Sequence, residues 1–160
     1  FDIALSNGTH GIIMEMREYS GWASAQLTWL QLSISVDNVA SASAVNVNNQ
    51  YWYDVVVTNT SVGVSLSRIV LTDVYNPTVR TCVVAVSANN PGCSLNTAAE
   101  QWECDIQTTV NPNATFSVRF FYQAADTCTS TQNVNTANAV GYQDAWSSPP
   151  VSHSAFVTIN

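Results

Sequence analysis

The chain has 160 residues and a formal net charge of −7, with four Arg, no Lys and 9% charged residues. A nucleic-acid-binding surface needs clustered basic residues against the phosphates, so we expect no nucleic-acid partner. No run of about 20 apolar residues is present, so we also expect no insertion into a membrane. The length suits one domain with a short extension.

The first 26 residues predict an N-terminal arm built from two segments in which apolar and polar residues alternate. The first segment is FDIALS and the second is GIIMEMREY. Alternation of period two is typical of β-strands with one apolar face. The apolar positions on that face are Phe1, Ile3 and Leu5 in the first segment and Ile12, Met14 and Met16 in the second.

Three interpretations of this arm remain open. Asn7-Gly8 between two alternating runs is a strong hairpin signal, which predicts a self-contained hairpin. The arm could instead pair with an edge of its own domain. The third interpretation is a donor strand, which adds to the open sheet edge of another subunit and contributes apolar side chains to it.

Residues 27–160 predict one all-β domain. Short alternating stretches recur with turn signals such as Asn76-Pro77 between them, a spacing typical of a sandwich or barrel. We expect seven or eight strands, with residues 37–50 forming a loop or a weak edge strand and residues 135–142 a weak strand. The stronger predictions are residues 30–36, 51–60, 66–77, 79–88, 101–108, 114–124 and 152–160.

The four cysteines, Cys82, Cys93, Cys104 and Cys128, allow three pairings. Neither C-x-x-C spacing nor a nearby His predicts zinc. An even count in a β-rich chain of this composition predicts two disulfides and an oxidising compartment. We therefore expect a secreted, extracellular protein.

The stretch YWYDVVVTNTSVGVSLSRIVLTDVYNP resembles the conserved-repeat, immunoglobulin-like (Ig-like) domains of bacterial cell-surface proteins. GCSLNTAAEQWECDIQTTVNPNATFSVRF and the final NTANAVGYQDAWSSPPVSHSAFVTIN are similar to later parts of the same pattern. The resemblance covers roughly residues 30–160 and implies an antiparallel Ig-like β-sandwich outside the cell. It also implies the disulfide Cys93–Cys104, and with it Cys82–Cys128.

Candidate sites for chemistry are few. His10 and His153 are the only histidines, and no nucleophile motif such as G-x-S-x-G is present. We expect no catalytic site, no metal site and no cofactor. Sequons at Asn7, Asn59 and Asn113 are candidate glycan sites, although a composition this rich in Asn, Ser and Thr yields about three by chance.

These patterns together predict a structural subunit of an extracellular, pilus-like filament. Its partners would be other copies of itself, joined head-to-tail by the N-terminal arm in a helical assembly, as in the donor-strand-assembled pilins that the arm resembles. The alternative is a monomeric adhesive or carbohydrate-binding surface module, since five Trp and six Tyr could form a sugar-stacking platform. A secreted hydrolase is a weaker third interpretation.

Overall fold

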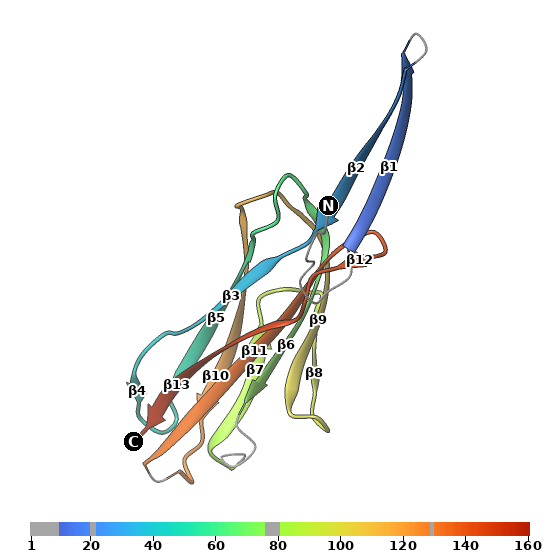
Figure 1. Ribbon diagram of the computed structural model, residues 1–160. Helices are drawn as coiled ribbons and strands as arrows, with labels where there is room; N and C mark the ends of the chain where they lie inside the picture. Colours follow the sequence, from blue (N-terminus) through green and yellow to red (C-terminus); the bar gives the residue numbers. More distant parts are fainter. Residues whose placement is uncertain (1–9, 20–21, 76–80, 129) are drawn as a thin grey trace.

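The computed structural model describes residues 10–19, 22–75, 81–128 and 130–160, with side chains from residue 31 onward. The described chain is all-β, and its strands form an antiparallel Ig-like sandwich with a separate hairpin (Figure 1). This confirms the predicted fold class. Phe1, Ile3, Leu5 and Asn7 lie outside the described residues.

The first sheet of the sandwich has four strands in the order β3-β5-β10-β7. They are β3 (Ile34–Ala40), β5 (Gln50–Asn59), β10 (Thr115–Ala124) and β7 (Val83–Ala88). Pairing between all neighbours is antiparallel, with an irregular register between β10 and β7 at Phe121/Tyr122.

The second sheet follows the order β4-β13-β11-β6-β9-β8, and β12 pairs with β11 beside this path. Its strands are β4 (Ala44–Val45), β13 (Val151–Ile159), β11 (Thr131–Gln143), β6 (Leu66–Tyr75), β9 (Gln101–Val110), β8 (Cys93–Asn96) and β12 (Trp146–Ser147). The short β4 runs parallel to β13, whereas the other pairs of this sheet are antiparallel.

The core lies between the two sheets and follows the alternation of the sequence. In β5 the inward face carries Tyr51, Tyr53, Val55 and Val57, all at most 1% exposed. In β10 Val118, Phe120 and Tyr122 are buried on the inward face, and Phe116 is partly buried. Burial of these large apolar side chains is the main source of the sandwich's stability.

The structure corrects the strand predictions at three places. Residues 30–36 are not one strand, because Gln31 ends β2 and Ile34 begins β3. Leu32 is buried between them, and the N–H group of Ser33 donates to the Ser61 hydroxyl at 2.9 Å. The chain passes here from the hairpin into the sandwich, so one continuous ladder cannot form. Residues 93–96, which we did not predict as a strand, form β8.

The third correction concerns residues 135–142, which we expected to be weak. They belong to the thirteen-residue β11, which pairs with β6 on one side and β13 on the other. Small and amide residues fit this central strand because its inward neighbours across the core are large tyrosines, and the amides hydrogen-bond to the tyrosine hydroxyls.

Candidate functional site

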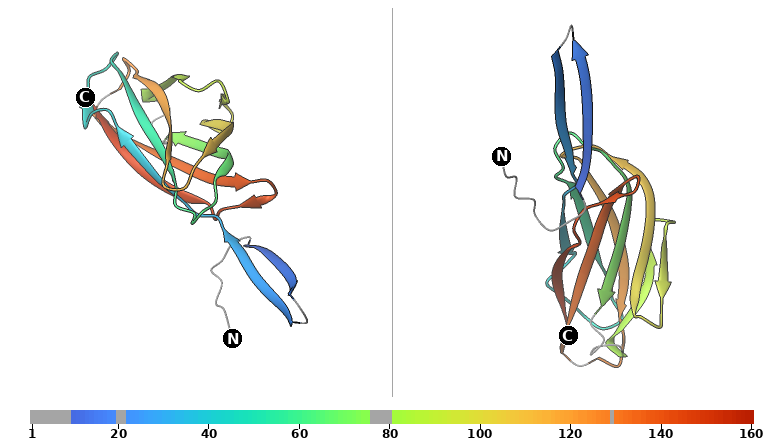
Figure 2. Two further views of the ribbon diagram at one scale, coloured as in Figure 1. Left: turned by 90° about the horizontal axis from the view of Figure 1, so that it is seen from above. Right: turned by 45° about the vertical axis from the view of Figure 1, so that its right-hand side comes forward.

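The N-terminal hairpin is the part of the described structure that lies outside the sandwich. It consists of β1 (His10–Tyr19) and β2 (Trp22–Gln31), which form a two-stranded sheet of their own. The end of β2 that leads into β3 lies beside the sandwich, and the hairpin extends away from it (Figures 1 and 2). The expected boundary between residues 26 and 27 falls inside β2.

The register of the hairpin groups apolar residues on one face. Residues directly opposite each other in an antiparallel pair share a face of the sheet. Ile12 pairs with Trp29, Met14 with Leu27 and Met16 with Ala25. The three apolar positions predicted in the second segment therefore share a face with three apolar positions of β2. Neither strand pairs with a described strand of the sandwich.

The sandwich has two lateral sides, which differ in their edge strands and in their distance from the disulfides. On one side β3 and β13 run close together without pairing, and the N–H group of Asn38 donates to His153 Nδ1 at 3.0 Å. On the other side β7 and β8 end the two sheets. The disulfides lie toward this second side: Cys93–Cys104 joins β8 to β9, and Cys82–Cys128 joins the start of β7 to the segment after β10.

These are the two disulfides that the resemblance implies, with Cα–Cα distances of 4.0 Å for Cys93–Cys104 and 5.0 Å for Cys82–Cys128. Two disulfides in one domain indicate folding in an oxidising compartment. The described part of the chain has no helix with the length and hydrophobicity needed to cross a bilayer.

A buried polar cluster connects the two sheets inside the core. Asp73 on β6 is fully buried; its Oδ2 accepts hydrogen bonds from the Tyr122 hydroxyl at 2.5 Å and from Asn135 Nδ2 at 2.9 Å. Asn38 Nδ2 donates to Asn135 Oδ1 at 2.6 Å. Burial raises the pKa of Asp73 to about 7, although the two hydrogen bonds act in the opposite direction.

The cluster therefore holds a carboxyl group that is largely protonated below neutral pH. Burial also raises the pKa of the Tyr122 phenol, and the nearby Asp73 carboxyl raises it further. The side chains of Asp73, Asn135 and Tyr122 are each 0% exposed, so no substrate reaches them in this fold. We assign the cluster a role in aligning the two sheets.

Half-buried aromatic residues lie on the outer face of the first sheet. The rings of Trp52 and Phe121 are 6.3 Å apart, and the Arg119 guanidinium lies 4.8 Å from the Trp52 ring centroid. Arg119 also forms a two-point ion pair with Asp54, with N–O distances of 2.7 and 2.9 Å. The structure places Trp52 on the outer side of β5, opposite the buried Tyr51 and Tyr53.

The two histidines lie in different sheets. His10 lies in β1, and His153 is an exposed residue of β13 that binds the Asn38 N–H group. Among the residues that the structure describes, no three His, Cys, Asp or Glu side chains are placed to hold a metal.

The sequons of the sandwich differ in accessibility. Asn59 is 0% exposed, and its Nδ2 donates to the carbonyls of Val64 and Val110, each at 2.8 Å. A glycan on Asn59 is incompatible with this fold, so that candidate site is wrong. Asn113 is exposed in the turn between β9 and β10, with a φ of 62°.

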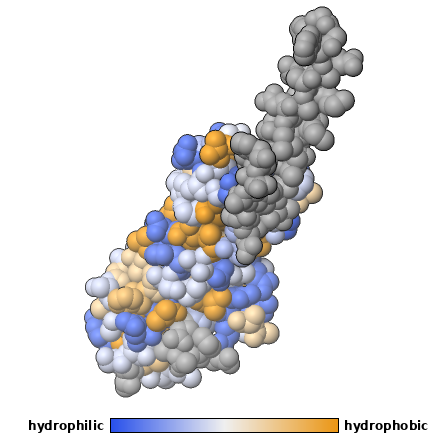
Figure 3. Space-filling view, viewed as in Figure 1, coloured by the Kyte–Doolittle hydropathy of each residue, from blue (hydrophilic) through white to orange (hydrophobic). Residues whose placement is uncertain are grey.

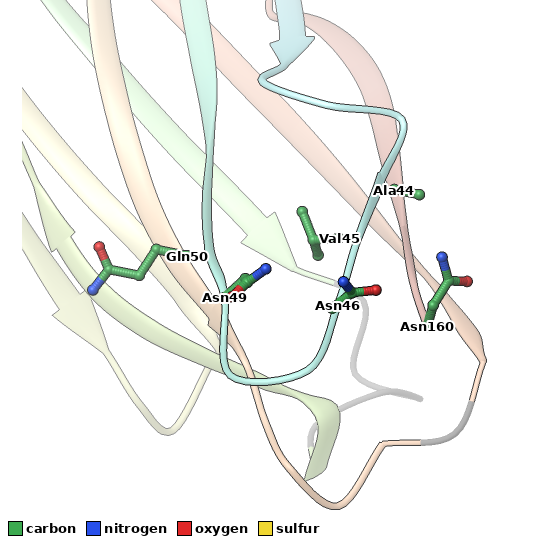
Figure 4. Close-up of a pocket in the computed structure, with 6 residues that line it drawn as sticks. All are labelled: Ala44, Val45, Asn46, Asn49, Gln50 and Asn160. Carbon is green, nitrogen blue, oxygen red and sulfur yellow. The ribbon is translucent and has the colours of Figure 1, made fainter.

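A shallow hollow of about 440 Å³ lies at the end of the sandwich opposite the hairpin (Figures 1 and 4). None of its lining side chains ionises at neutral pH, so it offers no acid–base pair. The lining residues are Ala44, Val45, Asn46, Asn49, Gln50 and Asn160.

No protein-family model matches the sequence, and no curated protein does either. Solved structures with a similar fold exist at low sequence identity. A cohesin module from a Clostridium perfringens family 33 glycoside hydrolase has a TM-score of 0.57 and 10% identity over 82% of this chain and 98% of that one.

Two major pilins are similar as well. SpaD from Corynebacterium diphtheriae has a TM-score of 0.54 and 10% identity over 78% of this chain and 35% of that one. BcpA from Bacillus cereus has a TM-score of 0.51 and 12% identity over 93% of this chain and 47% of that one. This chain thus spans less than half the length of each pilin. At such identities the likeness establishes the fold, which is an Ig-like β-sandwich.

Proposed function

We propose that the protein is a structural subunit of an extracellular, pilus-like filament and that its N-terminal segment joins one subunit to the next. The observation that carries this proposal is the hairpin, a sheet that pairs with no described strand of its own sandwich and whose register defines an apolar face. A two-stranded hairpin alone is marginal in water, so it needs a surface on which to pack.

Three further features support an assembly role over an enzymatic one. The buried carboxyl group is closed off from solvent, His153 Nδ1 accepts a hydrogen bond from the Asn38 N–H group, and the fold is shared with major pilins. We therefore assign no catalysis and no cofactor to the subunit. Two disulfides suit an appendage exposed outside the cell.

Electron microscopy of the purified full chain tests the proposal. We expect filaments from the native sequence and dispersed subunits from the double variant Met14→Lys with Leu27→Lys, which places two charges at opposing positions of the hairpin. The matched control, Glu15→Lys with Gln26→Lys, changes an opposing pair on the other face and should retain filaments. Filaments from the first variant would refute the assembly role of the apolar face.

A carbohydrate-binding surface module is the second candidate, and the outer pair Trp52 and Phe121 favours it. Sugars bind proteins by stacking on such aromatic faces. The Arg119 guanidinium already lies over the Trp52 ring, which leaves less of the indole for a sugar. Binding to a glycan panel that is lost in Trp52→Ala, from a chain that stays monomeric, would favour this candidate over the filament.

A further inference from the structure

Strand β13 has an open edge along most of its length. It pairs with β11 from Val151 to Ile159, but on its other side, among the residues that the structure describes, only Thr158 and Ile159 pair, both with β4. The Thr158 N–H group donates to the Ser43 carbonyl at 2.9 Å on that side. Because alternate residues of a strand direct their main-chain groups to the same side, those of Ser152, Ser154 and Phe156 face the open edge.

The core is less completely covered beside this open edge. At the β4 end, Val157 and Ile159 are 0% exposed. Further back along the same inward face, Ala155 is half-buried and His153 is exposed, although Ala137, paired with His153 on β11, is fully buried. The sandwich is therefore closed where β4 covers β13 and incompletely covered where β13 lacks a neighbour.

Strand β3 lies opposite this edge, and together they form what we call the β3–β13 seam (residues 34–40 and 151–157). The hydrogen bond from Asn38 N–H to His153 Nδ1 links the two strands where a strand ladder is absent. Val39 and Phe156 are each 54% exposed along the seam. Figure 3 shows apolar patches among polar residues on the face over which these strands run.

The opposite side of the sandwich is a poorer site for strand addition. Its edge strands β7 and β8 have six and four residues, and the pairing of β7 with β10 is irregular. Short and irregular edge strands are features that natural sheets use against edge-to-edge association. By length alone, the nine-residue β13 is the better match for the ten-residue strands of the hairpin.

We infer that the β3–β13 seam receives the N-terminal hairpin of a second copy of the chain. The hairpin adds an edge to β13 and turns its apolar face toward the incompletely covered core. This inference rests on the proposed function and names the receiving surface. Within one molecule the hairpin points away from the sandwich (Figures 1 and 2), so the occupant is a different copy. Such a head-to-tail contact repeats without closing and builds a filament.

Two variants of the full chain test the receiving surface. Ser154→Pro removes an N–H group that faces the open edge, so the pairing of β13 with β11 keeps its hydrogen bonds. Phe156→Lys places a charge on the outer face of β13, beside its open edge. Val84→Lys on β7 is the control, because Val84 is 52% exposed and Phe156 54%. We expect filaments from the control and folded monomers, by circular dichroism and sedimentation, from both seam variants.

Mixing a seam variant with the hairpin variant is the most specific test of the contact between the two surfaces. The Ser154→Pro chain keeps its hairpin, and the Met14→Lys, Leu27→Lys chain keeps its seam. Each should be monomeric alone, and an equimolar mixture should form a one-to-one dimer that cannot grow.

The outcomes separate the two proposals. Filaments from both seam variants, with none from the hairpin variant, would overturn the seam and leave the filament function standing. Filaments from the hairpin variant would overturn the role of the hairpin in joining subunits, which is the part of the proposed function on which the seam depends. Monomers from the Val84→Lys control as well would place the contact elsewhere than the seam.

Discussion

The hairpin and the sandwich are both antiparallel β-structure, yet they obtain stability in different ways. The sandwich encloses a core between two sheets and carries two disulfides and a buried polar cluster. The hairpin has strands as long as those of the core and a grouped set of apolar residues, but the described part of the chain provides no second layer that pairs with it. Strand patterning alone therefore does not make a stable unit; an opposing layer does.

The largest expected contrast comes from removing apolar volume in each region. Phe120 is 0% exposed and packs near Trp102, with ring centroids 6.0 Å apart. Phe120→Ala should lower the free energy of unfolding of the subunit by about 3–5 kcal/mol. Met14→Ala in the hairpin should leave the denaturant midpoint of a monomeric subunit almost unchanged. Equal losses at both positions would mean that the hairpin belongs to the same cooperative unit.

The two disulfides of the sandwich should differ in how much each contributes to the free energy of unfolding. In the chain-entropy description, closing a longer loop stabilises more. The sequence separation is 46 residues for Cys82–Cys128 and 11 for Cys93–Cys104. Replacing the first pair by Ser should cost about 4 kcal/mol and replacing the second about 3 kcal/mol. Urea unfolding of the two double variants measures the difference, and a larger loss from the shorter loop would contradict the expectation.

The buried carboxyl group of Asp73 predicts that the stability of the sandwich depends on pH. Asp73 has a pKa of about 7 in the folded state, above its ordinary value of 3.8, so the folded chain binds the proton more tightly. Its contribution to stability is present below pH 4 and is lost as pH rises to about 7, by at most about 4 kcal/mol. Asp73→Asn should remove this loss and make the variant relatively more stable at pH 8 than at pH 5.

The smallest of these expected differences in stability is that between substitutions at the two sequon asparagines of the sandwich. Asn59→Ala leaves the carbonyls of Val64 and of the buried Val110 without their donor and should cost about 1–3 kcal/mol. Asn113→Ala, at an exposed turn, should cost less than about 1 kcal/mol. Thermal unfolding of unglycosylated protein compares them, and a similar shift in both would mean that the Asn59 hydrogen bonds contribute little.

The sequence determined the strands whose inward residues are apolar. Tyr51, Tyr53, Val55 and Val57 alternate with outward residues, and a period of two leaves one face for the core whatever the partner is. The same alternation marked the apolar positions of β1. Turn signals between the strands reduced the possible folds to a sandwich or a barrel. The cysteine count predicted two disulfides.

Only the tertiary structure decided where polar residues could be buried and which edges stayed open. Nothing local in Asn133 or Asn135 indicates a central strand. They are fully buried because tyrosines from the opposite sheet and Asp73 supply their hydrogen-bond partners. Likewise, the Asn7-Gly8 signal gave no information about the pairing of residues 10–19 with 22–31. Such choices depend on residues far apart in the chain, whose contacts form only when the two sheets pack.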